Sequence, residues 1–251
     1  MSAEHYLDLV GARVVQTPAL LLSRRAILDV LAARALGVLH GPAGSGKTFA
    51  ARLVLDELKL ARAWVQFPSR PTMLHVARRL YRELTGADAG RANRFDLSEQ
   101  LIGLLTDREW LLVVDEAQWL NRECIEYLRH LHDHARPRFS LLLVGGDGCW
   151  RVLSREPMLR SRIYRRVQFA PMPPAMVLQV IPGYHPIYEG APASLLALID
   201  DCYAHGCFRE WASFTHSALA FCHEQNNPTL TEPIARAVLE LHAGGAIEHA
   251  A

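Results

Sequence analysis

The residues between positions 41 and 48 have the types and the spacing of a phosphate-binding turn. They read GPAGSGKT, which fits the pattern GxxxxGK[ST]. In such a turn the glycines let backbone N–H groups face a phosphate, the lysine reaches the outer phosphates, and the last hydroxyl binds Mg²⁺. We therefore expect a nucleotide to contact Gly41, Pro42, Ala43, Gly44, Ser45, Gly46, Lys47, Thr48 and Phe49.

The sequence on both sides of this turn supplies the elements that must position it. A short apolar run over 36–40 precedes the turn, and an amphipathic segment over 48–60 follows it. A strand that enters the turn and a helix that leaves it would direct the positive end of the helix dipole at the phosphates. A glycine-rich connector is the alternative interpretation, but it leaves Lys47 and Thr48 unexplained.

Two acids end a second apolar run, WLLVVDEAQWL at 110–120. Continuous apolar character is typical of a strand buried on both faces of a parallel sheet. Asp115 at the end of this strand would hold Mg²⁺ together with Thr48, and Glu116 would polarise an attacking water. The second acid favours hydrolysis of the nucleotide over phosphoryl transfer to a small molecule. Two solvated carboxylates at a strand end are the alternative.

Apolar periodicity in the rest of the chain predicts an α/β fold. Helices are expected over 23–35, 48–60, 72–85, 97–107 and 119–135, and strands over 36–40, 62–67, 110–115, 139–145 and 164–172. This alternation specifies a parallel sheet flanked by helices. After the PMPP stretch at 171–174 only helices are expected, over 174–181, 193–205, 207–224 and 231–242. The chain would thus contain an N-terminal extension (1–20), an α/β nucleotide-binding core (21–172) and a small all-helical lid with a tail (173–251).

Composition indicates a globular protein whose charge is unevenly placed. No apolar run approaches the ~20 residues of a membrane span, and the first residues lack signal-peptide character, so we expect a cytoplasmic protein without a membrane partner. The formal net charge is +1. Six arginines nevertheless face a single acid between positions 151 and 166, and six more face two acids between positions 70 and 94. A neutral protein with two basic stretches can still hold a polyanion.

Taken together, these motifs resemble the AAA+ ATPases over about residues 20–241. The entry segment TPALLLSRRAILDVLAAR (17–34) and the stretch VVDEAQWL (113–120) are most similar to the DNA-transposition ATPases of the TniB, TnsC and MuB type. The resemblance implies ATP and Mg²⁺ as cofactors and hydrolysis that assembly or DNA stimulates. We expect this hydrolysis to be slow, because an acid such as Asp147 near the γ-phosphate would repel it unless Mg²⁺ or an arginine intervenes. The resemblance also implies rings or filaments on double-stranded DNA, target-site selection, and partnership with a DDE transposase and a target-selector protein.

The same resemblance implies roles for several arginines. In AAA+ oligomers an arginine just before the last core strand touches the γ-phosphate of the neighbouring subunit, and Arg160 or Arg162 occupies that place. Arg209 in GCFREW (206–211) would be the sensor 2 residue that contacts the γ-phosphate from the same subunit. The sensor 1 position, usually Asn, Thr or Ser, departs from the pattern here. The stretch reads LLLVGGDGCW (141–150), which leaves Asp147 as the nearest polar side chain.

The basic stretch at 70–94 is the candidate DNA-contacting surface. Repeated in every subunit of an oligomer, a few arginine–phosphate contacts would give salt-sensitive binding that is indifferent to sequence. The candidates are Arg70, Arg78, Arg79, Arg82, Arg91 and Arg94. A solvated helix face explains these residues equally well.

Two other classes of function stay open. An AAA+ ATPase that acts on a protein partner, in secretion, defence or helicase loading, would assemble with nucleotide but not respond to duplex DNA. A small-molecule P-loop kinase offers no reason for Glu116 or for a helical lid that carries an arginine.

Overall fold

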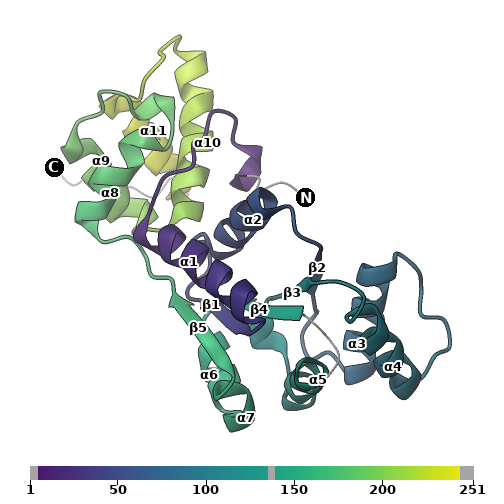
Figure 1. The fold of residues 1–251 in the computed structure, drawn as a ribbon. Coiled ribbons are helices and arrows are strands. Elements are labelled where there is room, and N and C mark those ends of the chain that lie inside the picture. The colour runs from purple at the N-terminus through teal and green to yellow at the C-terminus, as the bar shows by residue number, and fades with distance from the viewer. Residues whose placement is uncertain (1–4, 135–138, 244–251) are drawn as a thin grey trace. The chain divides into compact units, whose positions relative to one another are not determined.

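The computed structural model describes residues 5–134 and 139–243. The described chain falls into two compact units (Figure 1). The first contains Ala19–Ala43 and Lys47–Phe169, and the second contains residues 5–18, Gly44–Gly46 and residues 170–243. The two units are described separately below.

A five-stranded parallel sheet forms the centre of the first unit. Its order is β2-β3-β4-β1-β5, with bounds β1 Leu36–His40, β2 Arg62–Gln66, β3 Trp110–Asp115, β4 Phe139–Gly145 and β5 Ile163–Gln168. Every residue of the three inner strands is buried, because helices cover both faces of the sheet. Burial alternates along much of the two edge strands, β2 and β5.

The helices of the first unit cover the two faces of the sheet. They are α1 Pro18–Ala33, α2 Lys47–Leu58, α3 Met73–Thr85, α4 Arg94–Leu104, α5 Arg122–Asp133, α6 Cys149–Ser154 and α7 Pro157–Arg160. Apolar residues of α1 and α2 pack with one set of strand residues, such as Val113 and Val144. Apolar residues of α3, α4 and α5 pack with the alternate set, such as Leu112 and Leu143. Successive side chains of a strand point to opposite faces, so one apolar run serves both cores.

Local capping fixes where several of these helices begin. The side chains of Thr72, Asn93 and Asn121 accept hydrogen bonds from the first backbone N–H groups of α3, α4 and α5. Gly86, with φ of 74°, ends α3 in the left-handed conformation. Figure 1 shows α3 and α4 side by side as a helical hairpin, which the chain inserts between β2 and β3.

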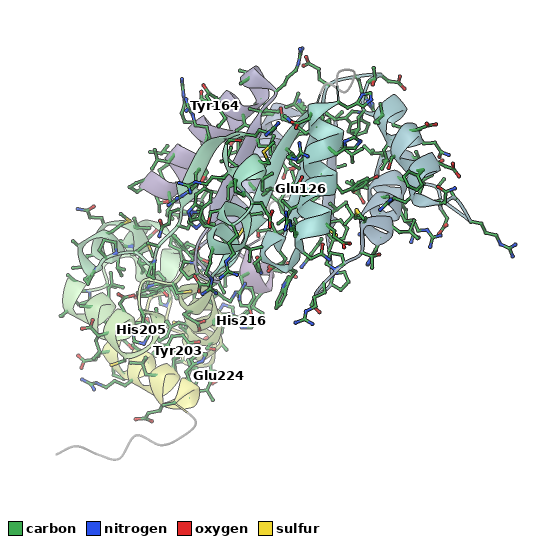
Figure 2. The ribbon with its side chains drawn as sticks, turned by 90° about the horizontal axis from the view of Figure 1, so that it is seen from below. Glu126, Tyr164, Tyr203, His205, His216 and Glu224 are labelled. Carbon is green, nitrogen blue, oxygen red and sulfur yellow. The ribbon has the colours of Figure 1, made fainter. Side chains whose placement is uncertain are left out.

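The second unit is helical and has its own core. It contains α8 Pro174–Val180, α9 Ala193–Ile199, α10 Phe208–Glu224 and α11 Glu232–His242. Trp211 and Phe214 of α10 are fully buried at its centre, and Leu9 from the N-terminal segment joins the same core. Figure 2 labels Tyr203, His205, His216 and Glu224 on this unit, and Tyr164 and Glu126 on the first.

The structure confirms the predicted fold class: a five-stranded parallel sheet flanked by helices, followed by a helical region. Several boundaries differ. The helix expected over 119–135 begins at Arg122, because Asn121 caps it, and position 135 lies outside the described residues. The strand expected over 164–172 ends at Gln168. The short helices α6 and α7 were not predicted. None of the helices in the described residues is long and apolar enough to cross a membrane.

Candidate nucleotide-binding site

The turn between β1 and α2 has the backbone that a phosphate cradle requires. Gly41, Gly44 and Gly46 all have positive φ, at 146°, 74° and 92°. Residues with a side chain rarely adopt this conformation. A Cβ atom on Gly41 would also lie 2.3 Å from the carbonyl oxygen of Phe169, so the loop has no room for a larger residue there. The glycines that the motif specifies are therefore required by the geometry of the turn.

Lys47 is the first residue of α2 and is almost completely buried. Its Nζ donates a hydrogen bond of 2.6 Å to the carbonyl oxygen of Pro42 at the start of the turn. The ammonium group therefore lies against the loop on the side where the helix begins. A cation held there can balance the charge of a bound phosphate.

Thr48 and Asp115 meet although 67 positions separate them in the sequence. The Thr48 hydroxyl donates to the Asp115 carboxylate, with an Oγ1–Oδ2 distance of 3.2 Å. Burial raises the pKa of Asp115 above its usual range, while the hydrogen bond from the Glu116 N–H opposes this shift. A hydroxyl and a buried carboxylate side by side are the oxygen ligands that Mg²⁺ prefers. The residues present thus fit a Mg²⁺·nucleotide complex.

Glu116 directly follows β3 in an uncommon backbone conformation. Its φ is 56° and its ψ is 39°, which turns the chain sharply after Asp115. The Gln118 side-chain amide donates to the Glu116 carboxylate. Sequence analysis did not identify Gln118. The sequence offered one indirect signal for Gln118: at the end of β4, where a polar sensor 1 side chain is expected, it has Gly145 and Gly146.

His40, the last residue of β1, is a second site residue that the motifs did not reveal. Only 8% of its surface is exposed, and among the described residues its Nε2 atom has no hydrogen-bond partner. Its ring stacks on Trp150 at a centroid distance of 6.0 Å. Burial lowers the pKa of His40, and the positive charges of Arg166 and Lys47 add to this effect. His40 is therefore neutral at neutral pH.

Asp147, the nearest polar candidate for the sensor 1 residue, lies in the turn between β4 and α6. Its side chain is exposed. The polar side chain that contacts this loop is Gln118, whose Oε1 accepts a hydrogen bond from the Gly146 N–H.

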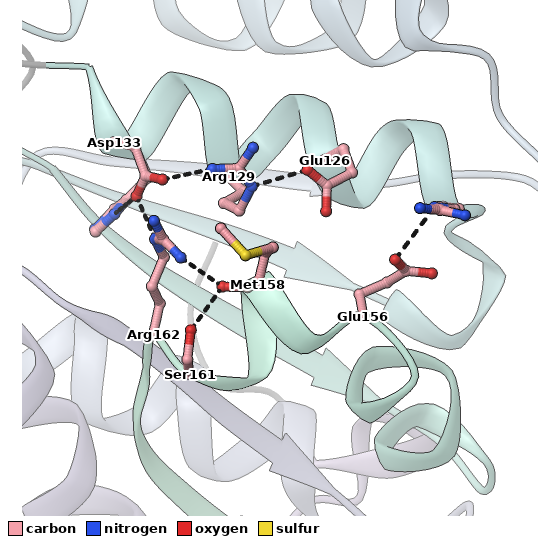
Figure 3. Close-up of polar contacts among 9 residues, drawn as sticks. Glu126, Arg129, Asp133, Glu156, Met158, Ser161 and Arg162 are labelled. Atoms are coloured by element: carbon pink, nitrogen blue, oxygen red, sulfur yellow. Dashed lines mark hydrogen bonds and ion pairs between the residues drawn. The ribbon is translucent and has the colours of Figure 1, made fainter.

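The two candidate finger arginines lie in different environments. Arg162 is anchored: its Nε lies 2.7 Å from Asp133 Oδ1, and its Nη1 donates to the Met158 carbonyl oxygen (Figure 3). Arg129 donates to the same Asp133 carboxylate. Burial alone would raise the pKa of Asp133, but the hydrogen bonds from Arg162 and Arg129 outweigh burial and lower it.

Arg160, at the end of α7, is exposed and forms no ion pair within residues 5–134 and 139–243. Two other arginines of this segment are engaged. The Arg165 Nε lies 2.7 Å from Asp29 Oδ2, and the Arg166 guanidinium stacks over Trp150 at 4.3 Å. Sequence analysis did not identify either partner.

Arg209 lies in the first turn of α10, within the second unit. Its backbone N–H donates a hydrogen bond of 3.1 Å to the carbonyl oxygen of Gly44, which belongs to the same unit. Its guanidinium lies over the ring of Tyr6, 5.4 Å from the ring centroid.

The candidate DNA-contacting arginines belong to the α3–α4 hairpin and the loops beside it. Five of the six are exposed, and in the described part of the chain these five form no ion pair: Arg70, Arg78, Arg79, Arg82 and Arg91. Arg94 differs, because it is half-buried against Met73 and stacks over Phe95 at 4.5 Å. Phe95 itself is 70% exposed.

Comparisons with known proteins concern the domain type and the fold. Residues 31–153 match the family model described as "AAA domain". The chain is similar to the Aeropyrum pernix ORC2 protein in its ADPNP–ADP complexes, at 18% identity, with 92% of this chain and 70% of that chain covered and a TM-score of 0.66. It is also similar to Cdc6p from Pyrobaculum aerophilum, at 16% identity, 89% and 67% coverage and a TM-score of 0.70.

A third similar structure is the Aeropyrum pernix ORC1 protein in complex with DNA, at 17% identity, 90% and 65% coverage and a TM-score of 0.64. No curated protein matches the sequence. The finer resemblance to TniB, TnsC and MuB stays a prediction. The P-loop, the strand-end acids, the sheet order and these similarities together identify the fold as that of the AAA+ P-loop NTPases.

Proposed function

We propose that the protein is an ATPase that binds ATP with Mg²⁺ and hydrolyses it to ADP and phosphate. One observation carries this proposal: the Thr48 hydroxyl and the Asp115 carboxylate meet at 3.2 Å, beside the buried Lys47 and directly before Glu116. These four side chains supply a metal-binding pair, a cation for the phosphates and a carboxylate for water. Mg²⁺ held by Thr48 and Asp115 would neutralise charge on the phosphates.

The residues of this chain have separate tasks in such a reaction. The P-loop N–H groups and Lys47 would hold the β- and γ-phosphates in place. Glu116 would orient the attacking water and accept its proton. Arg209, whose backbone bonds to Gly44 of the P-loop, would contact the γ-phosphate from within the same subunit.

We assign Arg160, not Arg162, as the arginine that one subunit supplies to its neighbour. Arg162 would have to break its ion pair with Asp133 and its bond to Met158 before reaching another subunit. Arg160 is exposed at the end of the short helix α7. An arginine supplied in trans makes hydrolysis depend on assembly, so we expect a ring or helical filament with slow turnover in the isolated subunit.

We further propose that the assembly binds duplex DNA without sequence preference through the α3–α4 hairpin. The exposed arginines Arg78, Arg79 and Arg82 support this, because arginines without ion pairs are available to phosphates. The similar ORC1 protein was solved in complex with DNA, which adds support. In a transposition system the assembly would select target sites and recruit a DDE transposase, with a target-selector protein as a further partner.

The test measures ATP hydrolysis and particle shape by negative-stain microscopy, with and without duplex DNA at low salt. Wild type is compared with Lys47→Ala and Arg160→Ala. The proposal expects DNA-dependent rings or filaments, and loss of hydrolysis in both variants. If wild type hydrolyses ATP and assembles but duplex DNA changes nothing, the ATPase acts on a protein partner instead. If hydrolysis persists in Lys47→Ala, the ATPase proposal is wrong.

A further inference from the structure

Gln118 connects two loops at the carboxyl ends of the inner strands. It lies in the single 3₁₀ turn Ala117–Trp119 that follows β3 and Glu116. Its Nε2 donates to the Glu116 carboxylate, and its Oε1 accepts a hydrogen bond of 2.7 Å from the Gly146 N–H after β4. One side chain therefore bonds both to the acid proposed to orient water and to the backbone at the sensor 1 position.

The two partners fix the orientation of this amide. A carboxylate only accepts hydrogen bonds and a backbone N–H only donates, so the amide nitrogen must face Glu116 and the amide oxygen must face Gly146. The side chain is half-buried, which limits competition from water. Hydrogen bonds to a charged group are stronger than those between neutral groups. The contact with Glu116 thus restricts where the carboxylate can point.

The glycines at the end of β4 leave the space that Gln118 occupies. A Cβ atom on Gly145 would lie 2.8 Å from Gln118 Oε1 and 2.4 Å from Cys149 Sγ. A Cβ atom on Gly146 would lie 3.3 Å from Gln118 Nε2. A side chain at Gly145 would displace the Gln118 amide, and one at Gly146 would require it to shift by a few tenths of an ångström. The lack of an Asn, Thr or Ser at this place therefore leaves the space that the Gln118 amide fills.

We propose that Gln118 is a positioning residue that holds the Glu116 carboxylate in the orientation used for hydrolysis and couples it to the loop after β4. Gln118 follows β3, and its amide takes the place of a polar side chain on the loop after β4. This inference rests on the proposed ATPase function, and it assigns Gln118 no direct contact with the nucleotide.

The first test separates orientation of Glu116 from nucleotide binding. In Gln118→Ala we expect kcat for ATP hydrolysis to fall about 10- to 100-fold, because a misplaced catalytic group loses rate. KM and the Kd of a fluorescent ATP analogue should stay within about twofold, because Gln118 does not touch the phosphates. Gln179→Ala removes an exposed glutamine of α8, to which no role is assigned, and should change neither constant.

Gln118→Glu guards against a variant that fails to fold. It has the same size and can still accept from Gly146, but it repels the Glu116 carboxylate instead of donating to it. We expect its kcat to be at least as low as that of Gln118→Ala, with circular dichroism and nucleotide affinity unchanged. A kcat close to wild type in Gln118→Glu would overturn the proposal.

A double-mutant cycle tests whether Gln118 acts through Glu116. In a Glu116→Gln background, Gln118→Ala should cause no further loss of kcat, because residues that act as a unit are not additive. Full additivity would assign Gln118 a purely structural role. If wild type shows no hydrolysis that depends on Lys47, the proposed ATPase function is wrong. If wild type hydrolyses ATP in a Lys47-dependent way and the Gln118 variants have the same kcat as wild type, only the positioning role is wrong.

Discussion

Two stretches of the first unit each contain six arginines, but these arginines have different surroundings. In the segment from Arg151 to Arg166, Arg162 and Arg165 pair with Asp133 and Asp29, and Arg166 stacks on Trp150. Around the α3–α4 hairpin, most arginines are exposed and unpaired within the described residues. The number of arginines in a stretch therefore does not indicate its role. Their partners do, and those partners lie far away in the sequence.

The largest expected effect concerns Arg160, one of the exposed arginines of the segment from Arg151 to Arg166. Arg160→Ala should lower kcat by about 10³-fold or more, as loss of an arginine supplied in trans does in related chemistry. ATP affinity should change little. Steady-state hydrolysis and nucleotide binding measure the two quantities.

A mixing experiment serves as the control for Arg160. Subunits with Lys47→Ala still carry Arg160, so mixing them with Arg160→Ala subunits should restore part of the activity. Absence of any recovery, or an Arg162→Ala variant with a larger kcat loss and intact folding, would reverse the assignment of the two arginines.

The next effect concerns the exposed arginines of α3. Arg78→Ala combined with Arg82→Ala should weaken duplex DNA binding by about 10-fold or more at low salt and lower the slope of log Kd against log salt by about one per lost phosphate contact. Fluorescence anisotropy at several salt concentrations measures both. Arg236→Ala, an exposed arginine of α11, is the matched control. An unchanged salt slope in the double variant would mean that α3 is only a solvated face.

A smaller effect is expected from Asp133, the shared partner of Arg162 and Arg129. Asp133→Asn should lower the free energy of unfolding by about 1 to 2 kcal/mol at neutral pH, because it weakens two charge-assisted hydrogen bonds at a partly exposed site. Urea denaturation measures it. Asp29→Asn, which weakens the ion pair with Arg165, provides the comparison.

The Asp133 contribution has a defined pH dependence. The pKa of Asp133 is lower in the folded protein than in the unfolded chain, where it is about 3.9. The stabilisation is therefore fully present above that value and is lost as the pH falls through the folded pKa. As the pH falls from 5 towards acid unfolding, the free energy of unfolding should therefore decrease less in Asp133→Asn than in wild type. The two decreases should differ by about 1 to 2 kcal/mol. An identical pH dependence in both proteins would contradict this role.

The smallest effect is expected for Arg165, whose side chain is more exposed than that of Arg162, at 41% against 33%. Arg165→Gln should lower the stability of the fold less than Asp133→Asn does, and salt should reduce its difference from wild type further. Thermal unfolding at two ionic strengths measures it. A loss larger than that of Asp133→Asn would show that exposure does not rank these two pairs.

Local patterns were sufficient for the sheet and the P-loop. The strands β1, β3 and β4 are continuous apolar runs, and the glycine spacing of 41–48 is specific. The helices α6 and α7, with six and four residues, are too short to show a helical period. Pattern analysis therefore found the long elements and missed the short ones.

Contacts between distant residues were beyond the reach of the sequence. Gln118 and Gly146 are 28 positions apart, and Arg162 and Asp133 are 29 positions apart. Nothing local at either position indicates its partner. The exposure of Arg160 and the engagement of Arg162 likewise depend on how a short helix packs, which no spacing rule predicts.

The arginines of β5 have a further consequence for the sheet. Within the described residues β5 is an edge strand that pairs with β1 alone, so its other side is open to an additional strand from another molecule. Charged side chains on edge strands discourage such strand addition, and natural proteins use them to avoid aggregation. Arg165 and Arg166 place charges on two successive residues near the middle of β5, one on each face of the sheet. A protein proposed to assemble through specific subunit contacts would thereby be protected from uncontrolled growth through its sheet.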